Sequence, residues 1–139
     1  MILILMFFHD GIMNCYSKID LLDIKEKGDR EILGCTIYNE QEIEIHELLK
    51  AYDEVIVATG DNTIREQKLL LLSSMDISIA TIIYPTAAIS PSAKVSKGSI
   101  VLAYAVIHTN AVIGIGCIIN TAAIVEHDCV VADFVNIFP

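Results

Sequence analysis

Branched aliphatic residues recur at every sixth position through the C-terminal part of the chain. Ile or Val fills all ten positions of this series, although only 34 of the 139 residues are Ile or Val, so chance would produce it about once in a million. The series is Ile83, Ile89, Val95, Val101, Ile107, Ile113, Ile119, Val125, Val131 and Ile137. Because a repeat of fixed period determines the whole architecture, this series constrains the fold more than any single element.

A second series of mostly small residues stands two positions before each branched residue. It consists of Thr81, Ala87, Ala93, Ser99, Ala105, Ala111, Cys117, Ala123, Cys129 and Val135. Because side chains two apart in a strand share a face, each six-residue unit supplies one branched and one small inward side chain, followed by a corner. Three units then form one triangular coil, and residues eighteen apart stack at the strand spacing of about 4.8 Å.

The period predicts a parallel β-solenoid over residues 81–139. A helix would need apolar residues three and four apart, and hairpins would need turns at longer, irregular intervals. The expected stacks are Ile83/Val101/Ile119/Ile137, Ile89/Ile107/Val125 and Val95/Ile113/Val131. The period leaves the handedness open, and a solenoid can also serve as a spacer without any activity.

Residues 1–80 alternate apolar runs with charged amphipathic stretches, which is typical of an α/β domain. We expect strands at 1–8, 18–22 and 54–58, the last of them a buried parallel strand. Helices are expected at 42–51 and from Thr63 to about Ser73, the second opened by a capping box between Thr63 and Glu66.

Polar residues follow two of these strands. The turn 59–62, which contains Gly60, precedes a helix, and Asp23 ends another strand. Open α/β sheets bind ligands at such places, so either residue could contact a ribose or a sugar, although acidic and glycine-containing turns are also common without a ligand. No glycine-rich phosphate loop precedes Asp23, and residues 9–11 are a poor substitute for one.

Composition excludes several classes of partner. A net charge of −9 and a pI near 4.7 argue against a nucleic acid or an anionic membrane, so we expect a small metabolite or coenzyme. The apolar segment 1–8 is far shorter than the ~20 residues of a membrane span and lacks the features of a signal peptide, which favours a cytoplasmic protein. Four cysteines without CxxC spacing favour buried free thiols over a zinc site or disulfides.

The most reactive corner of the predicted solenoid is Glu126-His127-Asp128. A histidine at a corner is often only solvated, but a carboxylate beside an imidazole fixes its tautomer and raises its basicity, so His127 is a candidate general base. His108 lies eighteen residues before Glu126 and should stack beside it. Nucleophile or metal roles for the two solenoid cysteines are disfavoured, because their spacing of twelve puts them on different faces.

Segments 120–135 and 89–95, with the Glu-His-Asp motif in register with the repeat, resemble the bacterial sialic acid O-acetyltransferase and nucleotide-amino-sugar N-acetyltransferase family. The likeness extends through 55–65 and 27–34 and covers most of the chain. It implies an α/β, truncated Rossmann-like N-terminal domain over 1–80 that binds a sugar nucleotide. It further implies a left-handed parallel β-helix of hexapeptide repeats over 81–139, which trimerises with acetyl-CoA between neighbouring subunits.

The resemblance also implies roles for single residues. His127 would be the general base, and Asp128 the carboxylate that raises its basicity. Asn120 would lie near the acceptor, and Gly60 and Asp23 would touch the sugar nucleotide.

Three differences separate the chain from the family pattern. The N-terminal glycine-rich loop is replaced by residues 1–16, and Asn136 stands where the family places a second histidine toward acetyl-CoA. The chain also stops at Pro139, before the further coils of the family, so both predicted domains are incomplete.

The expected function is an acetyl-CoA-dependent acetyltransferase without a metal, acting as a homotrimer on a nucleotide-linked amino sugar or on sialic acid. One alternative is a catalytically inactive, truncated β-helix remnant with an oligomerisation role. A weaker alternative keeps the solenoid and changes the acceptor, as in serine or amino-acid acyltransferases.

Overall fold

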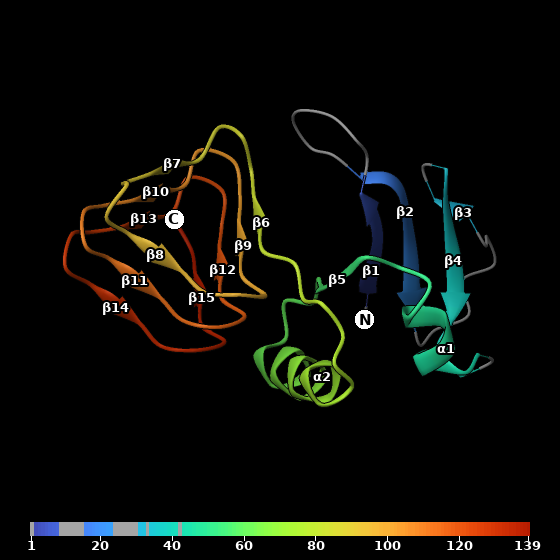
Figure 1. The fold of residues 1–139 in the computed structure, drawn as a ribbon. Helices are drawn as coiled ribbons and strands as arrows, with labels where there is room; N and C mark the ends of the chain where they lie inside the picture. The colour runs from blue at the N-terminus through green and yellow to red at the C-terminus, as the bar shows by residue number, and fades with distance from the viewer. Residues whose placement is uncertain (1, 9–15, 24–30, 33, 42) are drawn as a thin grey trace.

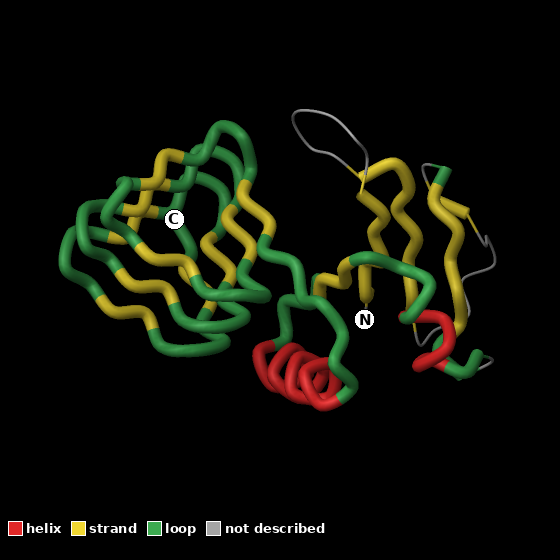
Figure 2. Tube along the Cα trace, in the orientation of Figure 1, coloured by secondary structure: helices red, strands yellow, loops and turns green. Residues whose placement is uncertain are grey.

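The computed structural model describes residues 2–8, 16–23, 31–32, 34–41 and 43–139. A mixed sheet with two helices forms the N-terminal part, and a solenoid of two-residue strands forms the C-terminal part (Figure 1). Figure 2 shows the solenoid as short strands alternating with corners, with the longer helix beneath the junction of the two parts.

Ten strands build the solenoid: β6 (Ile82–Ile83), β7 (Ala88–Ile89), β8 (Lys94–Val95), β9 (Ile100–Val101), β10 (Val106–Ile107), β11 (Val112–Ile113), β12 (Ile118–Ile119), β13 (Ile124–Val125), β14 (Val130–Val131) and β15 (Asn136–Ile137). They stack as three parallel sheets, β15-β12-β9-β6, β13-β10-β7 and β14-β11-β8. Partners lie eighteen residues apart, so all three predicted stacks are confirmed. This arrangement fits a left-handed β-helix.

Most of the branched and small inward residues form one continuous core along the solenoid. The interior of the middle coils is closed to solvent, and Val101, Ala105 and Cys117 are fully buried. The prediction of buried thiols holds for Cys117 but is wrong for Cys129, which is exposed. Cys129 precedes β14, which is the edge strand of its sheet in the described part of the chain. Cys35 is half-buried, and Cys15 lies outside the described residues.

Four-residue turns form the corners, and many are closed by a hydrogen bond from the fourth N–H to the first carbonyl, as from Ala111 to His108. The third residue of seven corners has a positive φ between 59° and 74°: Gly98, Tyr104, Asn110, Gly116, Ala122, Asp128 and Phe134. Asn and Asp tolerate this left-handed region better than most residues. Asn110 and Asp128 therefore suit their backbone positions.

Strands β1 (Ile2–Phe8), β2 (Tyr16–Asp23), β3 (Glu31–Ile32), β4 (Cys35–Asn39) and β5 (Glu54–Val57) form one sheet in the order β3-β4-β2-β1-β5. The strands predicted at 1–8, 18–22 and 54–58 are confirmed. The strand at 54–58 was predicted to be parallel, but β5 pairs with β1 in the antiparallel direction, so this prediction is wrong for that ladder. The β1–β2 pair is antiparallel too. The Rossmann-like domain is therefore not confirmed, because that fold needs a mostly parallel sheet.

Helix α1 (Ile45–Leu49) is shorter than the predicted 42–51, of which Glu42 lies outside the described residues. Helix α2 (Asn62–Ser74) is capped by Asp61, whose Oδ1 accepts a 2.9 Å hydrogen bond from the Ile64 amide. The predicted capping box at Thr63 is wrong, because the carboxylate two residues earlier supplies the cap. Neither helix is long and apolar enough to cross a bilayer, and the other described segments add no such helix.

Candidate active site

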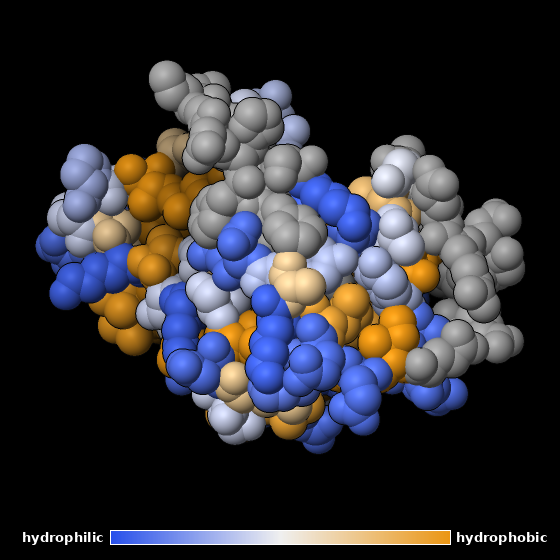
Figure 3. Space-filling view, turned by 45° about the vertical axis from the view of Figure 1, so that its right-hand side comes forward, coloured by the Kyte–Doolittle hydropathy of each residue, from blue (hydrophilic) through white to orange (hydrophobic). Residues whose placement is uncertain are grey.

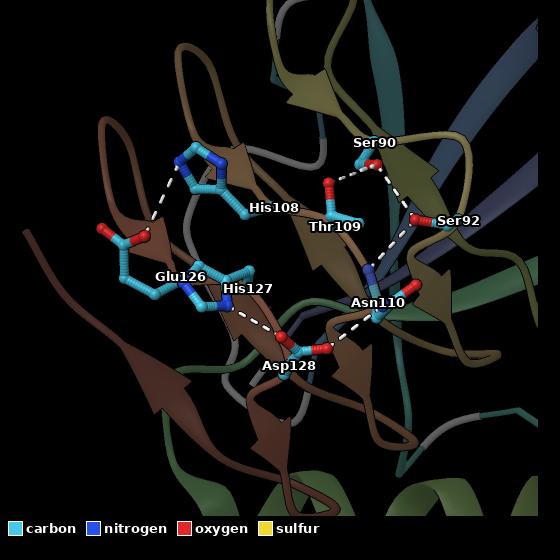
Figure 4. A network of polar contacts seen from close by, with 8 residues as sticks. All are labelled: Ser90, Ser92, His108, Thr109, Asn110, Glu126, His127 and Asp128. Carbon is cyan, nitrogen blue, oxygen red and sulfur yellow. Dashed lines mark hydrogen bonds and ion pairs between the residues drawn. The ribbon is translucent and has the colours of Figure 1, made fainter.

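His127 and Asp128 lie side by side in the turn between β13 and β14 (Figure 4). Nδ1 of His127 is 2.8 Å from Oδ2 of Asp128. A carboxylate only accepts hydrogen bonds, so the proton of the neutral imidazole resides on Nδ1, and Nε2 keeps its lone pair. Both side chains are exposed, so a substrate can reach Nε2.

The electrostatics of this pair favour a base. The hydrogen bond to Asp128 and the negative charge of its carboxylate raise the pKa of His127 above its usual value. In return, the hydrogen bonds from His127 and Asn110 lower the pKa of Asp128. The ionised carboxylate therefore makes His127 a stronger base than an isolated imidazole, as a general base requires.

The coil before His127 contributes two further side chains. Nε2 of His108 lies 3.9 Å from Oε2 of Glu126, which confirms the predicted stacking of these residues. Nδ2 of Asn110 donates a 3.1 Å hydrogen bond to Oδ1 of Asp128. Sequence reasoning missed Asn110, although the same eighteen-residue spacing that paired His108 with Glu126 also pairs Asn110 with Asp128.

Asn120 occupies a different corner, between β12 and β13. Its backbone N–H and its Nδ2 both donate to the carbonyl oxygen of Ile137, at 2.9 and 3.0 Å. Strand β13 separates this corner from His127, so the structure of one chain does not bring these two predicted residues together.

Gly60, predicted to contact the sugar nucleotide, and Asn136, predicted to contact acetyl-CoA, are in contact at the junction of the two parts of the chain. Nδ2 of Asn136 donates a 2.8 Å hydrogen bond to the carbonyl oxygen of Gly60. Oδ1 of Asn136 accepts a 2.7 Å hydrogen bond from Nη2 of Arg65. Both ends of the Asn136 amide are therefore engaged within the chain.

Arg65 is fully buried beneath this junction. Its guanidinium donates to the carbonyl oxygens of Thr59, Gly116 and Phe134 and to the side-chain oxygens of Asn62 and Asn136. Burial lowers the pKa of Arg65, and these acceptors compensate for the lost hydration of its charge. The sequence offered no signal for this role, because the partners in the solenoid lie far along the chain.

Asp23 ends β2 and is 4% exposed. It pairs with Ile2 of β1, and the next residue of β1 pairs with Val57, the last residue of β5. The carboxyl ends of β2 and β5 therefore lie at the same edge of the sheet, about 10 Å apart with β1 between them. Asp23 and the turn 59–62 thus lie at one edge of the sheet.

Metal ligation has no support in the part of the chain that the structure describes, which holds no cluster of three or more His, Cys, Asp or Glu side chains. The exposed His127 corner presents an imidazole, two carboxylates and the side-chain amide of Asn110. Such a set can move a proton and hold a polar substrate.

No protein-family model and no curated protein matches the chain. Among solved structures, the chain is similar to the acetyltransferase domain of PglB from Neisseria gonorrhoeae FA1090, solved in complex with acetyl coenzyme A. The identity is 32% and the TM-score 0.76, over 88% of this chain and 58% of that one.

A second similar structure is a histidine-to-alanine mutant of GDP-perosamine N-acetyl transferase from Caulobacter crescentus, in complex with CoA and GDP-perosamine. It is 28% identical with a TM-score of 0.70, over 78% of this chain and 51% of that one. The chain thus spans little more than half the length of these proteins. The predicted resemblance is confirmed for amino-sugar N-acetyltransferases, while these structures do not show the finer likeness to sialic acid O-acetyltransferases.

Proposed function

We propose that this chain acts as an acetyl-CoA-dependent acetyltransferase of a nucleotide-linked amino sugar. The observation that carries the proposal is the His127–Asp128 pair, which presents a free Nε2 on a parallel β-solenoid. Two similar structures, solved with acetyl-CoA or CoA, support the choice of coenzyme. The second of them is a complex with GDP-perosamine and supports a nucleotide sugar as acceptor.

Transfer by this site needs no covalent intermediate with the protein. The sugar amine attacks the thioester carbonyl of acetyl-CoA, and Nε2 of His127 takes the proton that the amine loses. The C–S bond then breaks as the C–N bond is completed, and the imidazolium returns its proton to the leaving thiolate. Asp128 stabilises the imidazolium between the two proton transfers.

The sugar nucleotide has a candidate position at the sheet edge that carries Asp23 and Gly60. Hydrogen-bonding groups at the carboxyl ends of strands and the N-terminus of α2 suit a ribose or a phosphate. Asn120 is proposed to contact the acceptor, and the coenzyme contact of Asn136 remains a prediction.

A homotrimer is part of the proposal, because apolar side chains flank the His127 corner on the outside of the solenoid. Ile124 on β13 is 56% exposed, and Val130 on β14 is 78% exposed. Figure 3 shows apolar surface on the solenoid side of the molecule, at the left of the view. A neighbouring subunit would cover such side chains and bring a second corner to His127.

Sedimentation velocity tests the assembly. We expect a trimer for the parent protein and a monomer for Val130→Glu. Leu70→Glu, which changes an exposed apolar residue on α2, is the matched control and should leave the trimer intact. A monomeric parent protein would overturn this part of the proposal.

Acetyl transfer tests the activity directly. The protein is incubated with acetyl-CoA and nucleotide-linked amino sugars or free sialic acid, and the products are measured by mass spectrometry, because the exposed Cys129 would react with a thiol reagent. His127→Ala should reduce kcat by about 10²-fold or more. His46→Ala, at an exposed position on α1, should retain full activity.

Equal rates for the parent and His127→Ala would remove His127 from the role of base. If sialic acid is acetylated and amino sugars are not, the proposal of an amino sugar as the acceptor is wrong. Calorimetry with acetyl-CoA tests the alternative of an inactive remnant: such a chain would bind no coenzyme and transfer no acetyl group.

A further inference from the structure

We infer that Asn110 is a positioning residue that holds Asp128 in the orientation that keeps the reactive tautomer of His127. This inference rests on the proposed role of His127, but the geometry that carries it is independent of any substrate. Asn110 comes from the preceding coil, in the turn between β10 and β11.

Each of the two carboxylate oxygens of Asp128 contacts a different side chain. Oδ2 lies 2.8 Å from Nδ1 of His127, and Oδ1 accepts the 3.1 Å hydrogen bond from Nδ2 of Asn110. The Asp128 side chain is 64% exposed, so packing does little to fix its rotation. The amide of Asn110 therefore provides the contact that holds the second oxygen on His127.

Asn110 is itself held by the coil before it. Its backbone N–H donates a 3.1 Å hydrogen bond to Oγ of Ser92, and its φ of 59° directs the side chain from the same kind of corner as Asp128. Ser92, Asn110 and Asp128 follow one another at eighteen-residue intervals and form a polar ladder along this corner (Figure 4). The backbone N–H of Asp128 also donates to the carbonyl oxygen of Thr109, at 2.9 Å, which ties the two turns together.

The polar ladder matters because only the Nδ1–H tautomer of neutral His127 can accept a proton at Nε2. A free neutral imidazole in water prefers the proton on Nε2, and a protonated Nε2 cannot accept a proton from the acceptor. An Asp128 carboxylate fixed on Nδ1 reverses that preference. Without Asn110, Asp128 can rotate toward water, and His127 returns to the unreactive tautomer for part of the time.

Several other ionisable groups belong to the same two turns as His127. From its own turn it has Glu126, Asp128 and the thiol of Cys129 as neighbours, and from the stacked turn it has His108. The carboxylate of Glu126 lies toward His108, so among the described side chains Asp128 is the group that contacts Nδ1 of His127.

Nitrogen-15 NMR of histidine-labelled protein tests the inference without a substrate. Asn110→Gly removes the amide and keeps a residue that adopts a positive φ. We expect mainly the Nδ1–H tautomer of neutral His127 in the parent protein, and a shift toward Nε2–H with a lower pKa of His127 in Asn110→Gly. Ser92→Ala should cause a smaller shift in the same direction.

Ala122→Gly is the matched control, because Ala122 has a φ of 60° at the corner between β12 and β13. It introduces the same flexibility away from His127 and should leave its tautomer unchanged. A purely structural role of Asn110 would lower thermal stability without moving the tautomer. An unchanged tautomer and pKa in folded Asn110→Gly would overturn the inference.

Activity then separates this inference from the proposed function. If the protein transfers acetyl groups, Asn110→Gly should lower kcat about tenfold with little change in the KM for acetyl-CoA. The effect should be far smaller than the ~10⁴-fold loss of kcat in serine proteases whose orienting aspartate is replaced by asparagine. A tautomer shift in a protein that transfers no acetyl group supports the positioning role while the proposed function fails.

Discussion

The Nε–H of Arg65 donates a 2.6 Å hydrogen bond to the carbonyl oxygen of Gly116, which lies 51 residues later in the chain. The same guanidinium reaches the carbonyl oxygen of Phe134 in the next coil and that of Thr59 before α2. One side chain of the N-terminal part therefore supplies donors to two coils of the solenoid. These bonds fix the turn 59–62 against the solenoid.

Arg65→Met should destabilise the protein by about 3 kcal/mol, because it removes the donor from the buried carbonyl oxygen of Gly116 and from the half-buried ones of Thr59 and Phe134. Urea unfolding followed by circular dichroism measures the change. Lys94→Met, which also removes one positive charge but at an exposed position on β8, should change the stability by less than about 0.5 kcal/mol. A loss of similar size in both variants would contradict the structural role of Arg65.

Gly116→Ala should cost about 2 to 3 kcal/mol through overpacking. A Cβ at this position would lie 2.5 Å from Cδ1 of Leu69 and 2.8 Å from Cδ1 of Phe134. The φ of 63° adds to this cost, because a residue with a Cβ is strained in the left-handed region. Gly60→Ala has no atom within 4 Å of its new Cβ and is the control, expected to unfold at the parent's urea concentration.

Asp128→Asn should move the pH dependence of acetyl transfer. The hydrogen bond and charge of Asp128 raise the pKa of His127, so their removal lowers that pKa. A base acts only when deprotonated, and the rising limb of kcat/KM against pH should therefore shift to lower pH. The maximum rate should also fall, because an amide can stabilise the wrong tautomer. A profile unchanged in position would argue against the contact in solution.

Asp20→Asn should remove a pH-dependent part of the stability. Burial alone would raise the pKa of Asp20, but hydrogen bonds from Lys18, Tyr52 and the Thr36 amide outweigh it and keep the pKa low. This stabilisation is complete above the pKa of an unfolded aspartate, near 3.9, and is lost as pH falls through the lower folded value.

Urea midpoints measured between pH 2 and 7 test this expectation. The variant should be less stable than the parent at neutral pH, and the gap should close in acid. Asp76→Asn, at an exposed turn, controls for the loss of one carboxyl group and should follow the curve of the parent. A constant gap at all pH values would contradict the low pKa of Asp20.

The solenoid could be predicted in detail because its contacts repeat at one fixed spacing. That spacing gave the pairing of Ile83 with Val101 and the proximity of His108 to Glu126. The N-terminal sheet offers no such rule, since an apolar strand such as β5 can pair in either direction and the choice depends on tertiary contacts. The role of Arg65 was missed for a related reason: its partners are backbone carbonyls, which every residue type carries.

The eighteen-residue stacking also determines which changes of chain length this molecule can absorb. One extra residue inside a strand such as β10 would turn the later branched side chains from the core to the surface. One extra residue at an exposed corner such as 126–129 leaves the strands in place. Insertions are thus tolerated at corners and not in strands, so the surface around His127 can change its shape while the core beneath it stays the same.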